Sequence, residues 1–183
     1  MLFRSKVKKL VERRIKQLET ICSEYKDTEI MQIYDSMNDI RKSMVIPVEP
    51  TWEQRLEKWK SVPYIGKSFG KDVLEIYTKK GERVRSKSEK IIADTFYEMG
   101  IEYKYECPIS LSGYGTVYPD FTILSMKLNR VIYWEHEGRM DDPKYVEKAV
   151  RKIDSYTKNG IIPGKHLILT YETSTYEVWE KPI

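Results

Sequence analysis

The chain has 183 residues, of which 40% are hydrophobic, so it can bury one core and carry a smaller appendage. It contains no apolar run of about 18 residues and no signal-peptide pattern, so we expect a cytoplasmic protein that does not associate with membranes. Its two cysteines, Cys22 and Cys107, show no metal-ligand spacing, which argues against a zinc site or a disulfide framework.

Charge is distributed unevenly along the chain. Residues 1–90 hold 21 Lys and Arg against 14 Asp and Glu, whereas residues 91–183 hold 11 against 14. A basic half that precedes an acidic half suits a protein that attracts a polyanion and holds a metal ion beside it. A solvated helical face explains the same imbalance without any partner.

The first 45 residues have the pattern of two amphipathic helices. Residues 5–25 and 28–44 each repeat apolar side chains at spacings of three and four, and the face opposite the first stripe is rich in Lys and Arg. Two such helices are too short to bury their stripes alone. We therefore expect residues 1–45 to form a basic helical appendage, either an antiparallel hairpin or a coiled-coil arm that pairs two copies into a homodimer.

The next segment, residues 46–78, is predicted to be a linker with one short helix. Pro47 and Pro50 cannot continue a helix, because each removes a backbone donor and favours extended structure in the residue before it. Thr51 is a suitable N-cap for a helix that runs through Trp59.

A dense run of cations follows in residues 79–90, and we expect it to contact nucleic acid. The nucleic-acid-binding candidates are Lys79, Lys80, Arg83, Arg85 and Lys87. A helix is predicted over residues 84–99, and Glu89 lies at the edge of its apolar stripe, where a carboxylate needs a cation nearby. Either a bound metal ion or an ordinary surface ion pair with Arg85 supplies that cation.

From residue 101 onward the pattern changes to that of β-strands. The predicted strands cover residues 101–109, 117–126, 131–137, 166–171 and 176–179. A helix is predicted over residues 142–159, between the third and fourth strands. We therefore expect residues 79–183 to form an α/β core, a mixed β-sheet flanked by helices.

Acidic residues lie on two of these strands. Glu135 and Glu137 are two residues apart and so point to the same face, away from the side chain of His136. If residues 125–129 form a turn, the hairpin brings Asp120 beside them. Carboxylates gathered on one sheet face repel each other, and a divalent cation removes the conflict. Magnesium prefers such oxygen ligands, and Mn²⁺ is its usual substitute.

At this point the sequence resembles the PD-(D/E)xK nuclease superfamily, the restriction-endonuclease-like proteins, over about residues 84–171. The metal-binding and catalytic residues that the resemblance implies are Glu89, Asp120 and Glu135. It also implies that His136 lends its backbone carbonyl to the metal, and it puts Glu137 where most members have lysine. The run Trp-Glu-His-x-Gly at residues 134–138 is similar to that of a group of phage and bacterial nuclease-like proteins.

The missing lysine has two candidate replacements. Glu137 can orient an attacking water but adds negative charge. Lys152, on the following helix, borders the stripe of Ala149 and Tyr156 and can reach the acids in space, with Lys148 behind it. Both Glu137 and Lys152 are therefore candidate catalytic residues.

These features predict a magnesium-dependent nuclease, in particular an endonuclease that hydrolyses phosphodiester bonds in double-stranded DNA. The preference for DNA follows from the resemblance alone. One alternative is a catalytically inactive nucleic-acid-binding or regulatory module that retains the nuclease fold. Another is an interaction or assembly protein whose function lies in residues 1–45.

Overall fold

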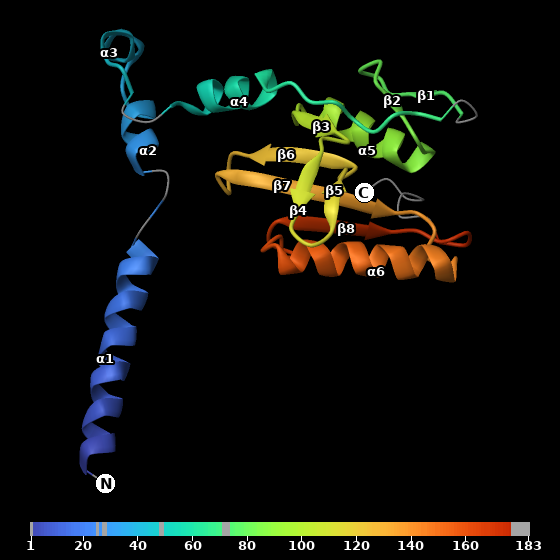
Figure 1. The fold of residues 1–183 in the computed structure, drawn as a ribbon. Helices are drawn as coiled ribbons and strands as arrows, with labels where there is room; N and C mark the ends of the chain where they lie inside the picture. Colours follow the sequence, from blue (N-terminus) through green and yellow to red (C-terminus); the bar gives the residue numbers. More distant parts are fainter. Residues whose placement is uncertain (1, 25, 27–28, 48–49, 71–73, 177–183) are drawn as a thin grey trace. The chain divides into compact units, whose positions relative to one another are not determined.

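The structure, a computed structural model, describes residues 2–24, 26, 29–47, 50–70 and 74–176 (Figure 1). The chain divides into two compact units, Met1–Gln54 and Arg55–Ile183. The boundary falls inside the predicted linker of residues 46–78. Each unit is described by itself below.

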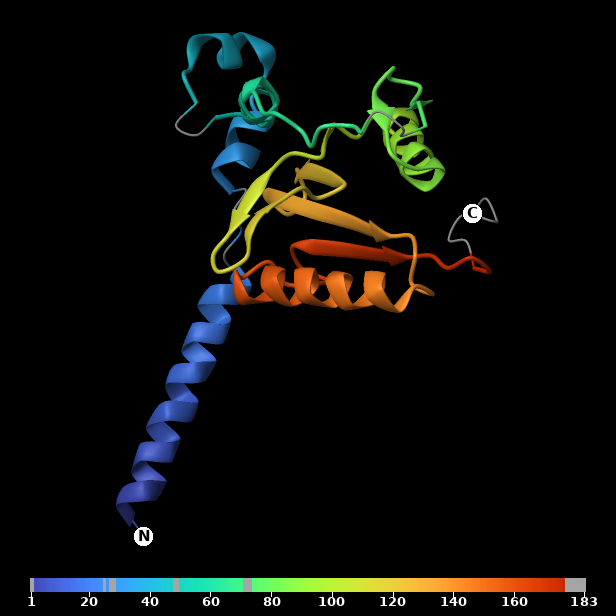
Figure 2. The same ribbon diagram turned by 45° about the vertical axis from the view of Figure 1, so that its right-hand side comes forward.

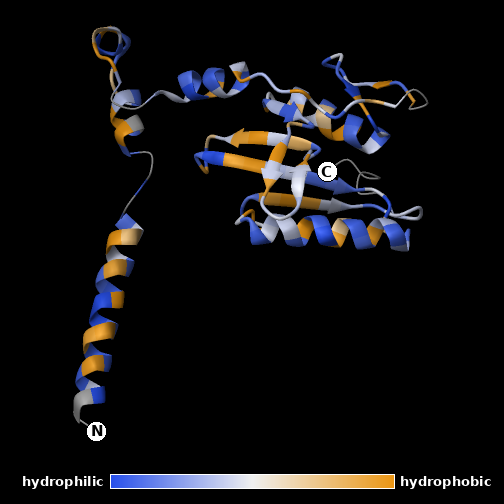
Figure 3. Ribbon diagram, viewed as in Figure 1, coloured by the Kyte–Doolittle hydropathy of each residue, from blue (hydrophilic) through white to orange (hydrophobic). Residues whose placement is uncertain are grey.

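The first unit contains three helices, α1 (Leu2–Glu24), α2 (Glu29–Asp35) and α3 (Asp39–Met44). The prediction of one helix over residues 28–44 was wrong, because Asn38 adopts an extended backbone and its side chain caps α3 by accepting the Arg41 N–H. Hydrophobic and hydrophilic residues alternate along α1 (Figure 3), and its apolar residues are 43–62% exposed. They are Val7, Leu10, Val11, Ile15, Leu18 and Ile21. A hairpin or dimer that buries this stripe remains a prediction.

Helix α4 (Trp52–Ser61) begins as the sequence predicts. The Thr51 hydroxyl accepts the Gln54 backbone N–H at 3.3 Å, and the Gln54 side chain accepts the Thr51 N–H at 3.1 Å. This reciprocal capping box satisfies two donors at the helix N-terminus.

The second unit is built on a four-stranded sheet with the order β3-β6-β7-β8. The strands are β3 (Tyr103–Tyr105), β6 (Phe121–Ser125), β7 (Arg130–Glu137) and β8 (Leu167–Tyr171). The first two pairings are antiparallel and β7 pairs with β8 in parallel, so the expected mixed sheet is confirmed. The hairpin of β6 and β7 is also confirmed, and it pairs Phe121 with Trp134 and Ser125 with Arg130.

Two long predicted strands are interrupted. Residues 101–109 are divided between β3 and β4 (Ile109–Leu111), because Glu106 has a left-handed backbone with φ of 46°. Residues 117–126 are divided between β5 (Gly115–Val117) and β6. Strands β4 and β5 form a separate hairpin. Of the predicted strand at 176–179, residues 177–179 lie outside the described part of the chain.

Helix α5 (Lys87–Glu98) begins three residues later than predicted. Arg83–Val84 form strand β2, which pairs with β1 (Ile76–Tyr77), and the Ser86 side chain then caps the helix by accepting the Glu89 N–H. Helix α6 (Pro143–Lys158) agrees with the prediction, and Asp142 caps it.

The two long helices of this unit cover opposite faces of the sheet. Trp134 of β7 packs in the core beneath α5, next to Phe96 and Phe121. Its neighbour Tyr133 packs in the second core with Tyr156 of α6. Because successive strand residues point to opposite faces, α5 and α6 lie on opposite sides of β7, and two views show α6 running alongside β8 (Figures 1 and 2).

Candidate active site

Hairpin β6–β7 brings Asp120 and Glu135 together. Asp120 lies one residue before Phe121, whose partner Trp134 is one residue before Glu135, so the two acids are opposite each other in the ladder register. The backbone N–H of His136 donates a hydrogen bond of 2.6 Å to Asp120 Oδ2. This bond holds the aspartate at the end of the hairpin.

Helix α6 supplies the cation that faces the strand acids. Lys152 Nζ lies 2.9 Å from Glu135 Oε2 and 2.8 Å from Glu137 Oε1. The ammonium group therefore bridges two carboxylates that are only 1% exposed. Lys152 thus reaches the acids in space, as the sequence led us to expect, while its catalytic role remains a prediction.

Two tyrosines of α6 complete the shell around these acids. Tyr156 donates a hydrogen bond of 2.6 Å to Glu135 Oε1, so both oxygens of this carboxylate have a donor. Tyr145 hydrogen-bonds to Glu137. Its pKa is raised by burial and by this bond to a carboxylate.

Glu89 lies in the first turn of α5 and is tied to the sheet. Its Oε2 accepts the Tyr105 hydroxyl at 2.6 Å and the Arg85 backbone N–H at 2.9 Å. Glu89 and Arg85 do not form the surface ion pair that was the alternative, because the Arg85 guanidinium group binds Glu106 at 2.6 and 2.9 Å instead.

Electrostatic repulsion connects the three predicted metal ligands. Asp120 is half-buried as a residue, but its carboxyl group is enclosed by neighbours. Burial raises its pKa well above the ordinary value, and the charges of Glu135 and Glu89 raise it further. Burial also raises the pKa of Glu135, against the lowering effect of Lys152 and Tyr156. Glu89 and Glu135 therefore both lie close enough to Asp120 for their charges to raise its pKa.

The charge state of Lys152 follows from the same neighbours. Burial by itself lowers the pKa of an ammonium group, but the negative charges of Glu135 and Glu137 outweigh it and raise the pKa of Lys152. Lys152 is therefore protonated at neutral pH. Lys152, whose side chain is 26% exposed, pairs with Glu135 and Glu137, and Asp120 and Glu89 add further acidic groups nearby, so the acids outnumber this cation.

The candidate metal ligands of the site suit a hard divalent cation, because each of their side chains offers carboxylate oxygens. Among the described residues, however, no three side chains form a ready metal-binding group. Glu135 is already held by Lys152 and Tyr156, so an ion at Asp120 and Glu135 requires their carboxylates to reorient. The backbone carbonyl of His136 as a ligand remains a prediction.

The side chain of His136 lies on the opposite face, as expected. Its Nδ1 is 3.0 Å from the Thr170 hydroxyl, and its Nε2 is 3.2 Å from Glu172 Oε2. The Ser88 hydroxyl donates a hydrogen bond of 2.7 Å to the same oxygen of Glu172. Glu172 thus links α5 next to Glu89 with β7 next to Glu135.

Sequence reasoning missed this link, as it missed Tyr105. Ser88 and Glu172 are 84 residues apart, and neither lies in a motif. Tyr156 was recognised only as part of the apolar stripe of α6.

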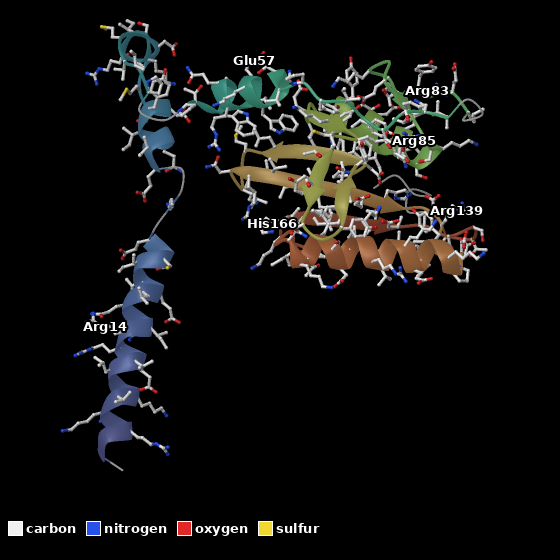
Figure 4. All side chains as sticks on the ribbon, in the orientation of Figure 1. Arg14, Glu57, Arg83, Arg85, Arg139 and His166 are labelled. Carbon is white, nitrogen blue, oxygen red and sulfur yellow. The ribbon has the colours of Figure 1, made fainter. Side chains whose placement is uncertain are left out.

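Most of the predicted nucleic-acid-binding cations form ion pairs or cation–π contacts within this unit. Lys79 is paired with Glu98, Arg85 with Glu106, and Arg83 with Glu75 at 3.7 Å. The Lys80 ammonium lies 4.8 Å from the centre of the Tyr103 ring. Lys87 is exposed on the first turn of α5. Figure 4 shows Arg83 and Arg85 projecting from the segment that leads into α5.

The fold and the site together define a mixed α/β protein with a buried cluster of acids around one lysine. The chain is similar to an uncharacterized protein of Methanocaldococcus jannaschii, with 40% identity over 100 residues. That match covers 54% of this chain and 8% of the relative, so the chain spans a small part of that protein's length. No family model and no solved structure matches the chain. Within the described residues, no helix is both long enough and apolar enough to cross a membrane.

Proposed function

We propose that this protein is a metal-dependent nuclease that hydrolyses phosphodiester bonds, in particular a magnesium-dependent DNA endonuclease. The observation that carries the proposal is that Asp120, the residue before β6, lies opposite Glu135 of β7, which pairs with Lys152 of α6, while the charge of Glu89 on α5 also acts on Asp120. Fold stability does not require such a cluster, because buried carboxylates are costly unless a cation compensates them.

In this proposal Asp120 and Glu135 hold the first Mg²⁺, and Glu89 holds a second ion or orders its waters. The ion, when bound, would relieve negative charge at the phosphate and lower the pKa of a water bound to it. Lys152 acts as a charged donor that orients groups at the phosphate. It does not act as a general base, because Glu135 and Glu137 keep it protonated.

The role of Glu137 follows from its contacts. On the resemblance, it stands where most members of the nuclease superfamily have lysine, yet Lys152 and Tyr145 already bind its buried carboxylate. Glu137 therefore holds Lys152 in place, and Lys152 provides the positive charge. Double-stranded DNA as the substrate rests on the resemblance to that superfamily.

A second candidate function is a catalytically inactive nucleic-acid-binding module. It is favoured by the lack of a ready group of three metal ligands among the described residues. In that case Lys152 serves as a permanent replacement for a metal ion between Glu135 and Glu137. The two functions differ in whether Mg²⁺ binds and whether DNA is cut.

The deciding experiment incubates the full chain with supercoiled plasmid in MgCl₂ or MnCl₂. We expect nicked and linear DNA, no cleavage after chelation with EDTA, and no cleavage by Asp120→Asn or Glu135→Gln. Asp154→Asn is the matched control, because Asp154 is an exposed acid that pairs with Lys158 on α6. Full cleavage by either site variant would overturn the proposal.

A measurement without DNA tests the metal itself. A ligand that binds only the folded protein stabilises it by about 2.7 kcal/mol at a concentration 100-fold above its dissociation constant. Mg²⁺ should therefore raise the unfolding temperature of the wild type and of Asp154→Asn, but not that of Asp120→Asn. No change for the wild type would favour the inactive module.

A further inference from the structure

Helix α6 carries a row of lysines that starts at the acid cluster. Lys144, Lys148 and Lys152 are spaced by four residues, so they lie along one side of the helix. Lys152 points into the site, whereas Lys144 and Lys148 are exposed. The row covers about 12 Å along the helix axis, since each residue adds about 1.5 Å.

Helix stability does not account for this row. Like charges four residues apart destabilise a helix by roughly 0.2–0.5 kcal/mol per pair. Lys144 also lies in the first turn of α6, where the positive end of the helix dipole disfavours a cation. Lys144 and Lys148 in this arrangement therefore cost helix stability unless an anion lies over them.

Other cations on α6 differ because each has an acid four residues away. Arg151 pairs with Glu147 at 2.6 Å, and Lys158 pairs with Asp154 at 2.6 Å. Within the described part of the chain, no ion pair is formed by the ammonium groups of Lys144 and Lys148. These two charges are therefore available to a partner at low desolvation cost.

The row also contrasts with the cationic segment that the sequence singled out. In that segment, Lys79 and Arg85 are already paired with Glu98 and Glu106. Moving these cations onto a polyanion would break pairs within the protein. Helix α6 is therefore a better candidate for a polyanion-binding surface than Lys79 and Arg85 are.

We propose that Lys144 and Lys148 bind the phosphodiester backbone of a nucleic acid and lead it to Lys152. The axial length of the row corresponds to roughly three to four nucleotide steps of one strand, given a rise of about 3.4 Å per nucleotide along the duplex axis. The Lys152 ammonium is paired with Glu135 and Glu137, so the row brings the strand to the acid cluster. The placement of the scissile phosphate at this cluster rests on the proposed nuclease function. Binding of the backbone by Lys144 and Lys148 does not require cleavage.

The test uses the full chain in the Asp120→Asn background, so that bound DNA is not cut. Fluorescence anisotropy of a labelled 20-base-pair duplex is measured over a range of salt concentrations. We expect Lys144→Ala/Lys148→Ala to weaken binding about tenfold or more and to reduce the slope of log K against log salt by about 1.8, the value for two phosphate contacts. Arg151→Ala/Lys158→Ala is the matched control, with the same change in charge on the same helix.

Equal losses in the two double variants, or no loss in the first, would overturn the proposal. Circular dichroism checks that both fold, as expected for exposed side chains. The same titration with a labelled RNA duplex shows whether the lysines bind DNA, RNA or both. At least one of the two duplexes must bind less tightly to Lys144→Ala/Lys148→Ala than to the control. Lysine-dependent binding without plasmid cleavage by the wild type would refute only the nuclease function. If the wild type cleaves plasmid but the Lys144→Ala/Lys148→Ala change leaves binding unaltered, only the proposal for these two lysines is refuted.

Discussion

Tyr156 of α6 donates a hydrogen bond of 2.6 Å to Glu135 of β7. Neither residue is more than 1% exposed, so the bond lies in the interior between helix and sheet. A buried carboxylate oxygen must have a donor, because water cannot reach it. The bond therefore fixes the orientation of Glu135 relative to Lys152.

Removing the Tyr156 hydroxyl should destabilise the protein. We expect Tyr156→Phe to lower the free energy of unfolding by about 1–3 kcal/mol, because Glu135 Oε1 loses its donor. Urea unfolding monitored by fluorescence measures the change. Tyr97→Phe, on the exposed side of α5, serves as the control and should stay within about 0.5 kcal/mol of the wild type. Equal stability of Tyr156→Phe and wild type would contradict this role.

Lys152 should matter for both stability and cleavage. Replacing it with Met leaves Glu135 and Glu137 without their cation, which costs about 3–5 kcal/mol for a buried pair. Lys158→Met, which breaks only an exposed pair, should cost less than about 1 kcal/mol. The double variant Lys152→Met/Glu137→Gln should recover part of the loss, because one of the unpaired charges is gone.

The catalytic part of this prediction needs a folded variant. Lys152→Arg keeps the charge but changes its geometry, so we expect it to fold and to cut plasmid at least tenfold more slowly. If Lys152→Met folds and cleaves plasmid at the wild-type rate, Lys152 has no part in the mechanism.

The pKa of Asp120 predicts a pH-dependent stability. Burial and the charges of Glu135 and Glu89 raise this pKa, so the folded protein binds the proton more tightly than the unfolded chain. Ionisation of Asp120 therefore lowers stability as pH rises from the ordinary pKa of aspartate through the raised value. Asn is neutral at every pH, so Asp120→Asn should be more stable than the wild type at pH 8 in EDTA.

The stability difference between Asp120→Asn and the wild type should narrow as the pH is lowered toward 4, where Asp120 is protonated. Urea unfolding at a series of pH values measures it. Asp154→Asn should show no such trend, because Asp154 is exposed. A difference that grows toward low pH would mean that Asp120 is stabilised as an anion.

Glu172 should position the two halves of the site. It holds Ser88, next to Glu89, and lies 3.2 Å from His136, next to Glu135. We expect Glu172→Ala to weaken Mn²⁺ binding about tenfold in a calorimetric titration, since Glu89 is then less well fixed. Glu172→Gln should retain much of the Mn²⁺ affinity, because its amide oxygen can still accept the hydrogen bond from the Ser88 hydroxyl. Glu147→Ala, an exposed acid of α6, is the control and should bind Mn²⁺ like the wild type.

Local pattern was sufficient for much of the fold. The helical period predicted α6, and Asp142 followed by Pro143 marked its start, because capping is a property of adjacent residues. The alternation of β7 put Glu135 and Glu137 on one face and His136 on the other. Together with the turn after Ser125, it also predicted that Asp120 would lie beside Glu135. Lys152 was found by the same helical spacing.

Long-range contacts decided the rest. Arg85 binds Glu106, and the backbone turns at Glu106, which no periodic pattern signals. Tyr105 reaches Glu89 across 16 residues, and Ser88 reaches Glu172 across 84. The sequence alone determined the types and order of most elements and the faces of the acids, because these depend on neighbours along the chain. Only the tertiary structure decided which cations are occupied and which remain available, because that depends on side chains brought together by folding.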